Sequence, residues 1–111
     1  MAIDIQKLFN YDIPAAMTRN PGGAQAIGAK YQINITGDGG GEWFVDASSS
    51  GPKCVSDNPG GADLTVTIEN VDFQHYYDNP QSNGPQLFFA GRIRTSGHPQ
   101  LFMQMYKLFQ L

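Results

Sequence analysis

Positive charge is scarce in this sequence, and the few basic residues do not form a cluster. The chain of 111 residues holds seven Lys and Arg against ten Asp and Glu, which gives a formal net charge of −3. A protein that binds nucleic acid through its phosphates presents a basic patch or stripe, because the phosphate backbone is negatively charged. We therefore expect no nucleic-acid partner.

Cysteine and long apolar runs are also lacking. Cys54 is the only cysteine, so the chain cannot form an internal disulfide. No stretch approaches the roughly 20 consecutive apolar residues that a membrane-spanning helix requires. The opening residues, MAIDIQKLF, lack the cationic start and apolar run of a secretion signal. These features predict a soluble protein of a reducing, intracellular compartment.

Large apolar side chains, by contrast, are abundant. Charged residues make up only 15% of the chain, whereas it holds seven Phe, five Tyr and four Met. A chain of this length forms one domain with a core of its own, and it is too short for a second globular unit. So many large apolar groups in one small domain indicate that it accommodates something apolar.

Alternating residues predict a sheet in the middle of the chain. In residues 31–36, YQINIT, every second residue is apolar, which is the pattern of a half-buried strand. GDGGG at 37–41 predicts a hairpin loop, and EWFVDA at 42–47 predicts the returning strand. Residues 53–56 and ADLTVTIE at 62–69 predict two further strands. We expect these four strands to form an antiparallel meander.

Helices are predicted before and after these strands along the chain. Apolar residues between 3 and 17 recur at helical spacing, and Pro14 suits the first turn of a second short helix. Residues 71–78, VDFQHYYD, predict an amphipathic helix with Asn70 or Asp72 as its N-terminal cap. The predicted fold class is therefore α+β, with helices over one face of the sheet.

A loop, a fifth strand and a last helix complete the prediction. NPQSNGP at 79–85 predicts a loop, and RIRTS at 92–96 predicts a strand with Arg92 and Arg94 on its solvated face. The apolar residues of the last helix occupy more of its circumference than the stripe of about 100° that a docked surface helix needs. These residues are Leu101, Phe102, Met103, Met105, Tyr106, Leu108, Phe109 and Leu111.

We expect this last helix to bury two faces. One face would pack on the sheet, and the other would line a cavity, contact a ligand or meet a second chain. Methionine side chains are flexible and polarisable, and they suit the lining of a variable apolar space. The alternative is that the helix is simply well buried in the core.

The order of several short motifs resembles the sterol carrier protein type 2 family. YQINITGDGGGEWFVDA is followed by ADLTVTI, by Asp72-Phe73, and then by LFFAGRIRTSG and the apolar last helix. The resemblance covers roughly residues 12–110. The positions that fit the family pattern are Trp43, Ala62, Asp63, Thr65, Asp72, Phe88, Phe89, Gly91 and Gly97.

The resemblance implies a five-stranded, mainly antiparallel sheet and helices around an apolar ligand tunnel. It implies a carrier, without a cofactor, that binds fatty acids, fatty acyl-CoA, sterols or phospholipids with little selectivity. Trp43 would anchor the core. For every residue assigned to the tunnel, packing in the core is an equal alternative. The residues assigned to the tunnel are Phe73, Tyr76, Tyr77, Phe88, Phe89, Leu101, Phe102, Met105 and Phe109.

The expected partners and location follow from the same resemblance. A lipid is the expected ligand, with transient contact with a membrane surface, and we expect a monomer or a weak dimer. Members of the family that act in peroxisomes commonly end in a tripeptide similar to Ser-Lys-Leu. This chain ends in Phe109-Gln110-Leu111. We therefore expect a cytoplasmic location.

The sequence offers little for catalysis or metal binding. Asp72 and His75 lie three residues apart on one predicted helix, which favours an exposed pair over a general acid and base. No Gly-x-Ser-x-Gly elbow is present, and His75 and His98 are isolated from other metal-binding residues. We expect no enzymatic activity. A protein-interaction or dimerisation module that uses the last helix is the alternative function, and a lipid-modifying esterase is a third.

Overall fold

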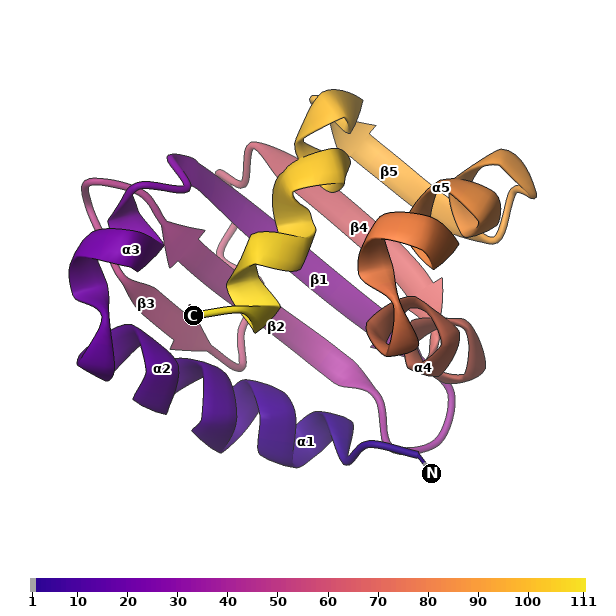
Figure 1. Cartoon of the computed structure of the whole chain (residues 1–111), viewed down its shortest axis with the longest axis horizontal. Coiled ribbons are helices and arrows are strands. Elements are labelled where there is room, and N and C mark those ends of the chain that lie inside the picture. Colours follow the sequence, from indigo (N-terminus) through magenta and orange to yellow (C-terminus); the bar gives the residue numbers. More distant parts are fainter. Residues whose placement is uncertain (1) are drawn as a thin grey trace.

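A five-stranded sheet with helices packed over one face forms the protein (Figure 1). The computed structural model describes residues 2–111. The predicted α+β class with a mainly antiparallel sheet is confirmed. None of the helices in this described part is long and apolar enough to cross a membrane. In chain order the elements are α1 Ile5–Lys7, η1 Leu8–Asp12, α2 Ile13–Arg19, α3 Pro21–Gln25, β1 Ala29–Thr36, β2 Gly41–Ala47, β3 Lys53–Val55, β4 Leu64–Glu69, α4 Asn70–Asp78, α5 Pro80–Phe89, β5 Ile93–Gly97 and η2 Pro99–Phe109.

The strand order is β3-β2-β1-β4-β5, and the two strands β1 and β4 run parallel. β1 and β2 form the predicted hairpin. The predicted four-strand meander is wrong, because the chain after β3 crosses to the free edge of β1. Asp63 fixes this crossing: its N–H donates to the Lys30 carbonyl at 2.8 Å, and its carboxylate accepts the Lys30 N–H at 2.8 Å. Alternation identifies a strand but does not tell which edge it joins.

The core lies between the sheet and the helices. On β4 the predicted alternation is confirmed, and on β1 the apolar face is, since Tyr31, Ile33 and Val66 have no accessible surface. Gln32, expected on the polar face of β1, is also buried, and its Nε2 donates to the Asp57 carbonyl at 3.1 Å. Trp43 on β2 is the expected core anchor. Its ring stacks on Phe9 with ring centroids 4.7 Å apart, and its Nε1 donates to the Asn10 side-chain oxygen at 2.9 Å.

The N-terminal segment is helical from Ile5 to Arg19. α1 passes into η1, a turn of π-helix, and α2 follows without a break (Figure 1). Pro14 lies in the first turn of α2, as predicted. Proline has no N–H to donate and crowds the carbonyl four residues before it, so an altered turn directly before it is expected. The two predicted helices therefore exist, but they form one rod.

The segment 79–85 was predicted as a loop, but its residues from Pro80 onward are helical and form the first part of α5. Pro80 occupies the first turn, where a missing N–H costs nothing, whereas Pro85 lies inside the helix. Gly84 lets the helix approach α4, because a Cβ there would lie 3.2 Å from the Tyr76 ring. Tertiary packing therefore overrides the weak helix propensity of this segment. The predicted helix α4 is present, but its cap is Glu69, with no side-chain hydrogen bond.

The last helix, η2, is a 3₁₀ helix. A 3₁₀ helix has three residues per turn, so residues three apart line one face. Phe102, Met105 and Leu108 follow this spacing and are 1–3% exposed. Within η2 only this row is fully covered, and Met103 is 55% exposed, so the cover of a second face by a ligand or a second chain stays a prediction. The remaining side chains of η2 therefore lie at or near the surface.

Candidate functional site

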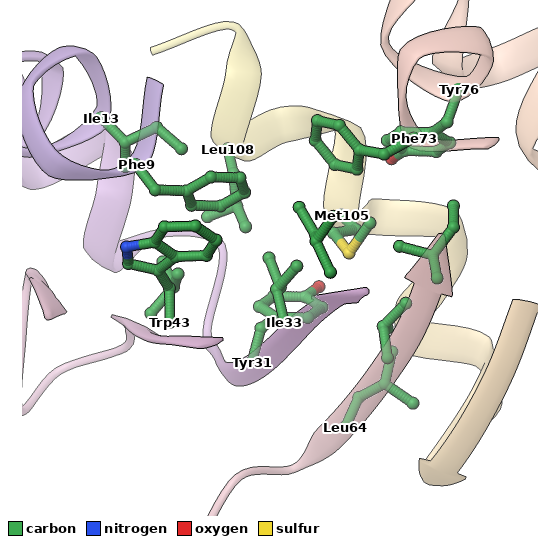
Figure 2. Packing of buried hydrophobic residues seen from close by; sticks show 14 of the residues in the cluster. Phe9, Ile13, Tyr31, Ile33, Trp43, Leu64, Phe73, Tyr76, Met105 and Leu108 are labelled. Carbon is green, nitrogen blue, oxygen red and sulfur yellow. The ribbon is translucent and has the colours of Figure 1, made fainter. Parts of the chain in front are cut away.

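Aromatic rings from four parts of the chain meet beneath η2. Phe109 contacts Phe9, Phe73 and Tyr77 edge to face, with ring centroids 5.6–6.1 Å apart. In Figure 2, Met105 projects from η2 between the stacked Phe9–Trp43 pair and the α4 side chains Phe73 and Tyr76. The helices are therefore held over the sheet by large, mostly apolar side chains.

A second part of the array continues from this core to the surface. Tyr76 contacts Phe102 with ring centroids 5.6 Å apart, and Phe102 stacks on Phe88 at 5.9 Å. Phe88 in turn meets the ring of Phe89 edge to face at 5.8 Å. Phe89 is 86% exposed. A continuous apolar path therefore leads from the fully buried Tyr76 to the outside.

The residues predicted for the tunnel differ in burial. Phe73, Tyr76, Phe102 and Met105 are 0–3% exposed, so they pack against one another in this conformation. Tyr77, Phe88, Leu101 and Phe109 are partly buried and pack against the core, whereas Phe89 is exposed. The sequence therefore predicted residues that the fold brings together, and their contact with a ligand remains a prediction.

An apolar groove separates α5 from η2. We call it the outer groove; its volume is about 360 Å³, and it is lined by Pro85, Phe88, Phe89, Pro99, Gln100, Phe102 and Met103. An inner groove of about 280 Å³ adjoins it and shares Pro85, Phe102 and Met103. Tyr76, Pro80, Gln81 and Tyr106 complete the lining of the inner groove. Both grooves are open to solvent, and residues of the aromatic core, Tyr76 and Phe102, border them.

Two tyrosine hydroxyls lie in this region. The Tyr31 hydroxyl donates to the Leu101 carbonyl at 2.9 Å and so ties β1 to the first turn of η2. The Tyr76 hydroxyl is buried and has no hydrogen-bond partner among residues 2–111. Burial raises the pKa of Tyr31 to about 12 and also raises the pKa of Tyr76, so both groups are neutral at physiological pH.

The groups considered for catalysis are engaged elsewhere. The Asp72 carboxylate accepts a hydrogen bond from Arg92 Nε at 3.0 Å, which raises the pKa of Arg92. Asp72 is therefore paired with Arg92 rather than poised as a base beside His75. Arg92, predicted on a solvated strand face, binds the Asp72 carboxylate.

Burial raises the pKa of the Cys54 thiol to about 12, so it stays protonated. Within the described part of the chain, no three His, Cys, Asp or Glu side chains group to hold a metal.

Sequence reasoning missed part of this region. Pro85 and Gln81 line the grooves, but their segment carries the composition of a loop. Tyr31 belongs to the alternating strand, so its burial was predictable. Its hydrogen bond to Leu101 was not, because the two residues are 70 positions apart.

The chain belongs to the SCP-2 sterol transfer family, because the model of that family matches residues 15–110. This match confirms the resemblance found in the sequence motifs.

Solved structures of similar fold come from a yeast and an insect. Sterol carrier protein 2 of Yarrowia lipolytica, in its apo form, is 20% identical with a TM-score of 0.68, over 96% of this chain and 84% of that one. Palmitated SCP2L2 of Aedes aegypti is 18% identical with a TM-score of 0.67, over 98% of this chain and 96% of that one. At these identities the likeness establishes the fold.

A curated relative is much longer than this chain. Hydroxysteroid dehydrogenase-like protein 2 of Rattus norvegicus is 28% identical over 85 residues, which are 76% of this chain and 16% of that protein. The chain therefore spans about one sixth of the length of this relative.

Proposed function

We propose that this protein binds lipids in the apolar interior beneath η2 and transfers them without catalysing a reaction. The observation that carries the proposal is the continuous apolar path from the exposed Phe89 through the two grooves to Tyr76. Family membership supports it, and the similar Aedes aegypti protein is palmitated. The ligand classes are fatty acids, fatty acyl-CoA, sterols and phospholipids.

Burial of a hydrocarbon chain supplies enough free energy for such a carrier. Each methylene group moved out of water contributes about 0.8 kcal/mol, so a sixteen-carbon chain gains roughly 12 kcal/mol before ordering costs. The protein therefore needs few polar contacts to bind lipids usefully, which accounts for low selectivity among the classes above.

A ligand must enter by separating the helices, because the row Phe102, Met105 and Leu108 is packed in this conformation. α5 is the element best suited to move. It contains the neighbouring residues Gly84 and Pro85. Proline weakens a helix because it lacks an N–H to donate, and glycine weakens it because its backbone loses more entropy on folding. Elements of low local stability are those that open first. We propose that α5 moves away from η2 to admit the lipid.

Exposed apolar side chains at the mouth of the outer groove suit contact with a membrane. Phe89 is 86% and Met103 is 55% exposed, and both line that groove. A lipid extracted at this place would pass from the bilayer into the groove without crossing water. We propose that the protein loads and unloads its ligand here during transient membrane contact.

The test is a titration of lipid-free protein with a fluorescent long-chain fatty acid, followed by displacement with palmitate, palmitoyl-CoA and cholesterol. We expect saturable binding near one ligand per chain that these competitors reverse. Binding that does not saturate, or no binding, would contradict the proposal.

A transfer assay between donor and acceptor vesicles tests the membrane contact. Phe89→Ser should slow transfer, whereas the matched control Val71→Ser should not. Val71 is 66% exposed but lies at the start of α4 and lines neither apolar groove. Equal transfer by the two variants would contradict loading at the mouth of the outer groove.

Dimerisation through η2 is the second candidate, and the exposure of Met103 favours it. In this case the side chains that line the outer groove of one copy would pack against those of a second copy. Sedimentation at micromolar concentration distinguishes the two, since a monomer there contradicts the interaction function. For the lipid carrier itself we propose a monomer or weak dimer and a cytoplasmic location.

A further inference from the structure

The Tyr76 hydroxyl is a polar group without a hydrogen-bond partner inside the aromatic core. Tyr76 is 1% exposed, and its hydroxyl has no hydrogen-bond partner among residues 2–111. Buried polar groups in folded proteins are almost always paired, because an unpaired one loses its hydrogen bonds to water without replacement. Phenylalanine would fill the same space without this cost. The presence of the hydroxyl therefore suggests that it has a function.

The position of Tyr76 links this hydroxyl to the proposed lipid path. The residue projects from α4 into the core (Figure 2) and belongs to the lining of the inner groove. Its ring contacts Phe102, which borders both grooves. A lipid that follows the path inward from Phe89 therefore reaches Tyr76 with its leading end.

The groove beside Tyr76 has an uncharged lining. Among residues 2–111, those that line the inner groove include no Lys, Arg, Asp or Glu. The nearby Tyr31 hydroxyl is neutral and donates to a backbone carbonyl. An ionised carboxylate or phosphate would enter this environment at a high cost, because nothing there neutralises it. A hydroxyl or ketone oxygen can accept the hydrogen bond that Tyr76 has to give.

We propose that Tyr76 is a specificity-determining residue, whose hydroxyl donates a hydrogen bond to an uncharged oxygen at the inserted end of the lipid. The inference rests on the proposed lipid-binding function and narrows it to a ligand class. Lipids with a terminal hydroxyl or ketone insert that end first and gain the bond. Free fatty acids insert their hydrocarbon end, leave the carboxylate at the mouth and gain nothing from Tyr76.

The experiment compares three ligands of equal chain length, 1-hexadecanol, palmitate and hexadecane, by displacement of a fluorescent fatty acid from wild-type protein and two variants. Tyr76→Phe removes only the hydroxyl. Tyr11→Phe is the matched control, because Tyr11 is 72% exposed and lines neither apolar groove. We expect Tyr76→Phe to weaken binding of hexadecanol about five- to tenfold, as the net loss of one hydrogen bond predicts. Binding of palmitate and hexadecane should not change, and Tyr11→Phe should alter none of the three.

Two results would overturn the inference, and they are distinguishable from each other. If Tyr76→Phe changes the three affinities equally or not at all while the ligands bind, the hydroxyl does not select the inserted end, and lipid binding itself stands. If none of the three ligands binds wild-type protein, both the inference and the proposed function fail.

Discussion

Truncation of Met105 should destabilise the lipid-free protein and favour the lipid-bound one. Met105 is 1% exposed and lies in the buried row of η2 that must separate from the core when a lipid enters. Removing such a side chain to Ala typically costs about 2–5 kcal/mol, because the packing contacts are lost and a cavity remains. For a domain of this size the midpoint of thermal unfolding, Tm, should fall by roughly 10 °C or more.

The bound lipid should reverse this loss. In the wild-type protein the ligand has to displace Met105, whereas in Met105→Ala the space already exists. A ligand at about one hundred times its Kd adds about 2.7 kcal/mol to the free energy of unfolding. Because Met105→Ala should bind palmitate more tightly than wild type, its Tm should rise more at equal palmitate concentration.

The assay is thermal unfolding followed by circular dichroism, with and without palmitate, on wild type, Met105→Ala and Ile5→Ala. Ile5 is the control because it is equally buried, at 2%, but belongs to α1 and lines neither apolar groove. Its truncation should cost a similar free energy and show no extra stabilisation by lipid. An equal gain for the two variants, or weaker palmitate binding by Met105→Ala, would refute the placement of the lipid beneath η2.

Three further predictions concern stability and local opening. In lipid-free protein, Tyr76→Phe should unfold at the wild-type urea concentration or above it, because it removes an unpaired hydroxyl. Tyr31→Phe should lower the free energy of unfolding by about 1–3 kcal/mol, because it leaves the Leu101 carbonyl unpaired. A large loss of stability for Tyr76→Phe would contradict this. The pKa of Tyr31 is raised to about 12, so the folded state holds this proton more tightly than the unfolded state, and the free energy of unfolding should decrease as pH rises from about 10 to about 12; a constant value from urea unfolding at stepped pH would count against it. Hydrogen exchange should be faster in α5 than in β1, and bound palmitate should slow it, because Gly84 and Pro85 weaken that helix; equal protection of α5 and β1 in lipid-free protein would contradict the proposed entrance.

Local patterns predicted most of the sheet. The alternation in β1 and β4 and the glycines between β1 and β2 identified those elements within two residues. The parallel pairing of β1 with β4 was not predictable in this way, because it depends on the crossing after β3 and on the contacts of Asp63 with Lys30. Strand order is a property of the whole chain, whereas alternation is a property of one strand.

The site was predicted as a set of residues but not as a geometry. The apolar face of η2 and the Phe88–Phe89 pair were visible in the sequence, whereas α5 was not. Its composition is typical of a loop, and the close approach of Gly84 to Tyr76 depends on tertiary packing that the sequence does not show. The pairing of Asp72 with Arg92 was likewise hidden, because the two residues are 20 positions apart and Arg92 lies outside α4, directly before β5.

The most direct test of lipid binding beneath η2 uses the methionine methyl groups as reporters in an NMR titration with palmitate. Met105 lies in the packed row of η2, Met103 lines both grooves, and Met17 is buried in the N-terminal helix α2. We expect the methyl signals of Met105 and Met103 to shift and to show contacts with the lipid chain, while the Met17 signal stays in place. A shift of Met103 alone would mean that lipid only adheres to the surface, and it would contradict the account.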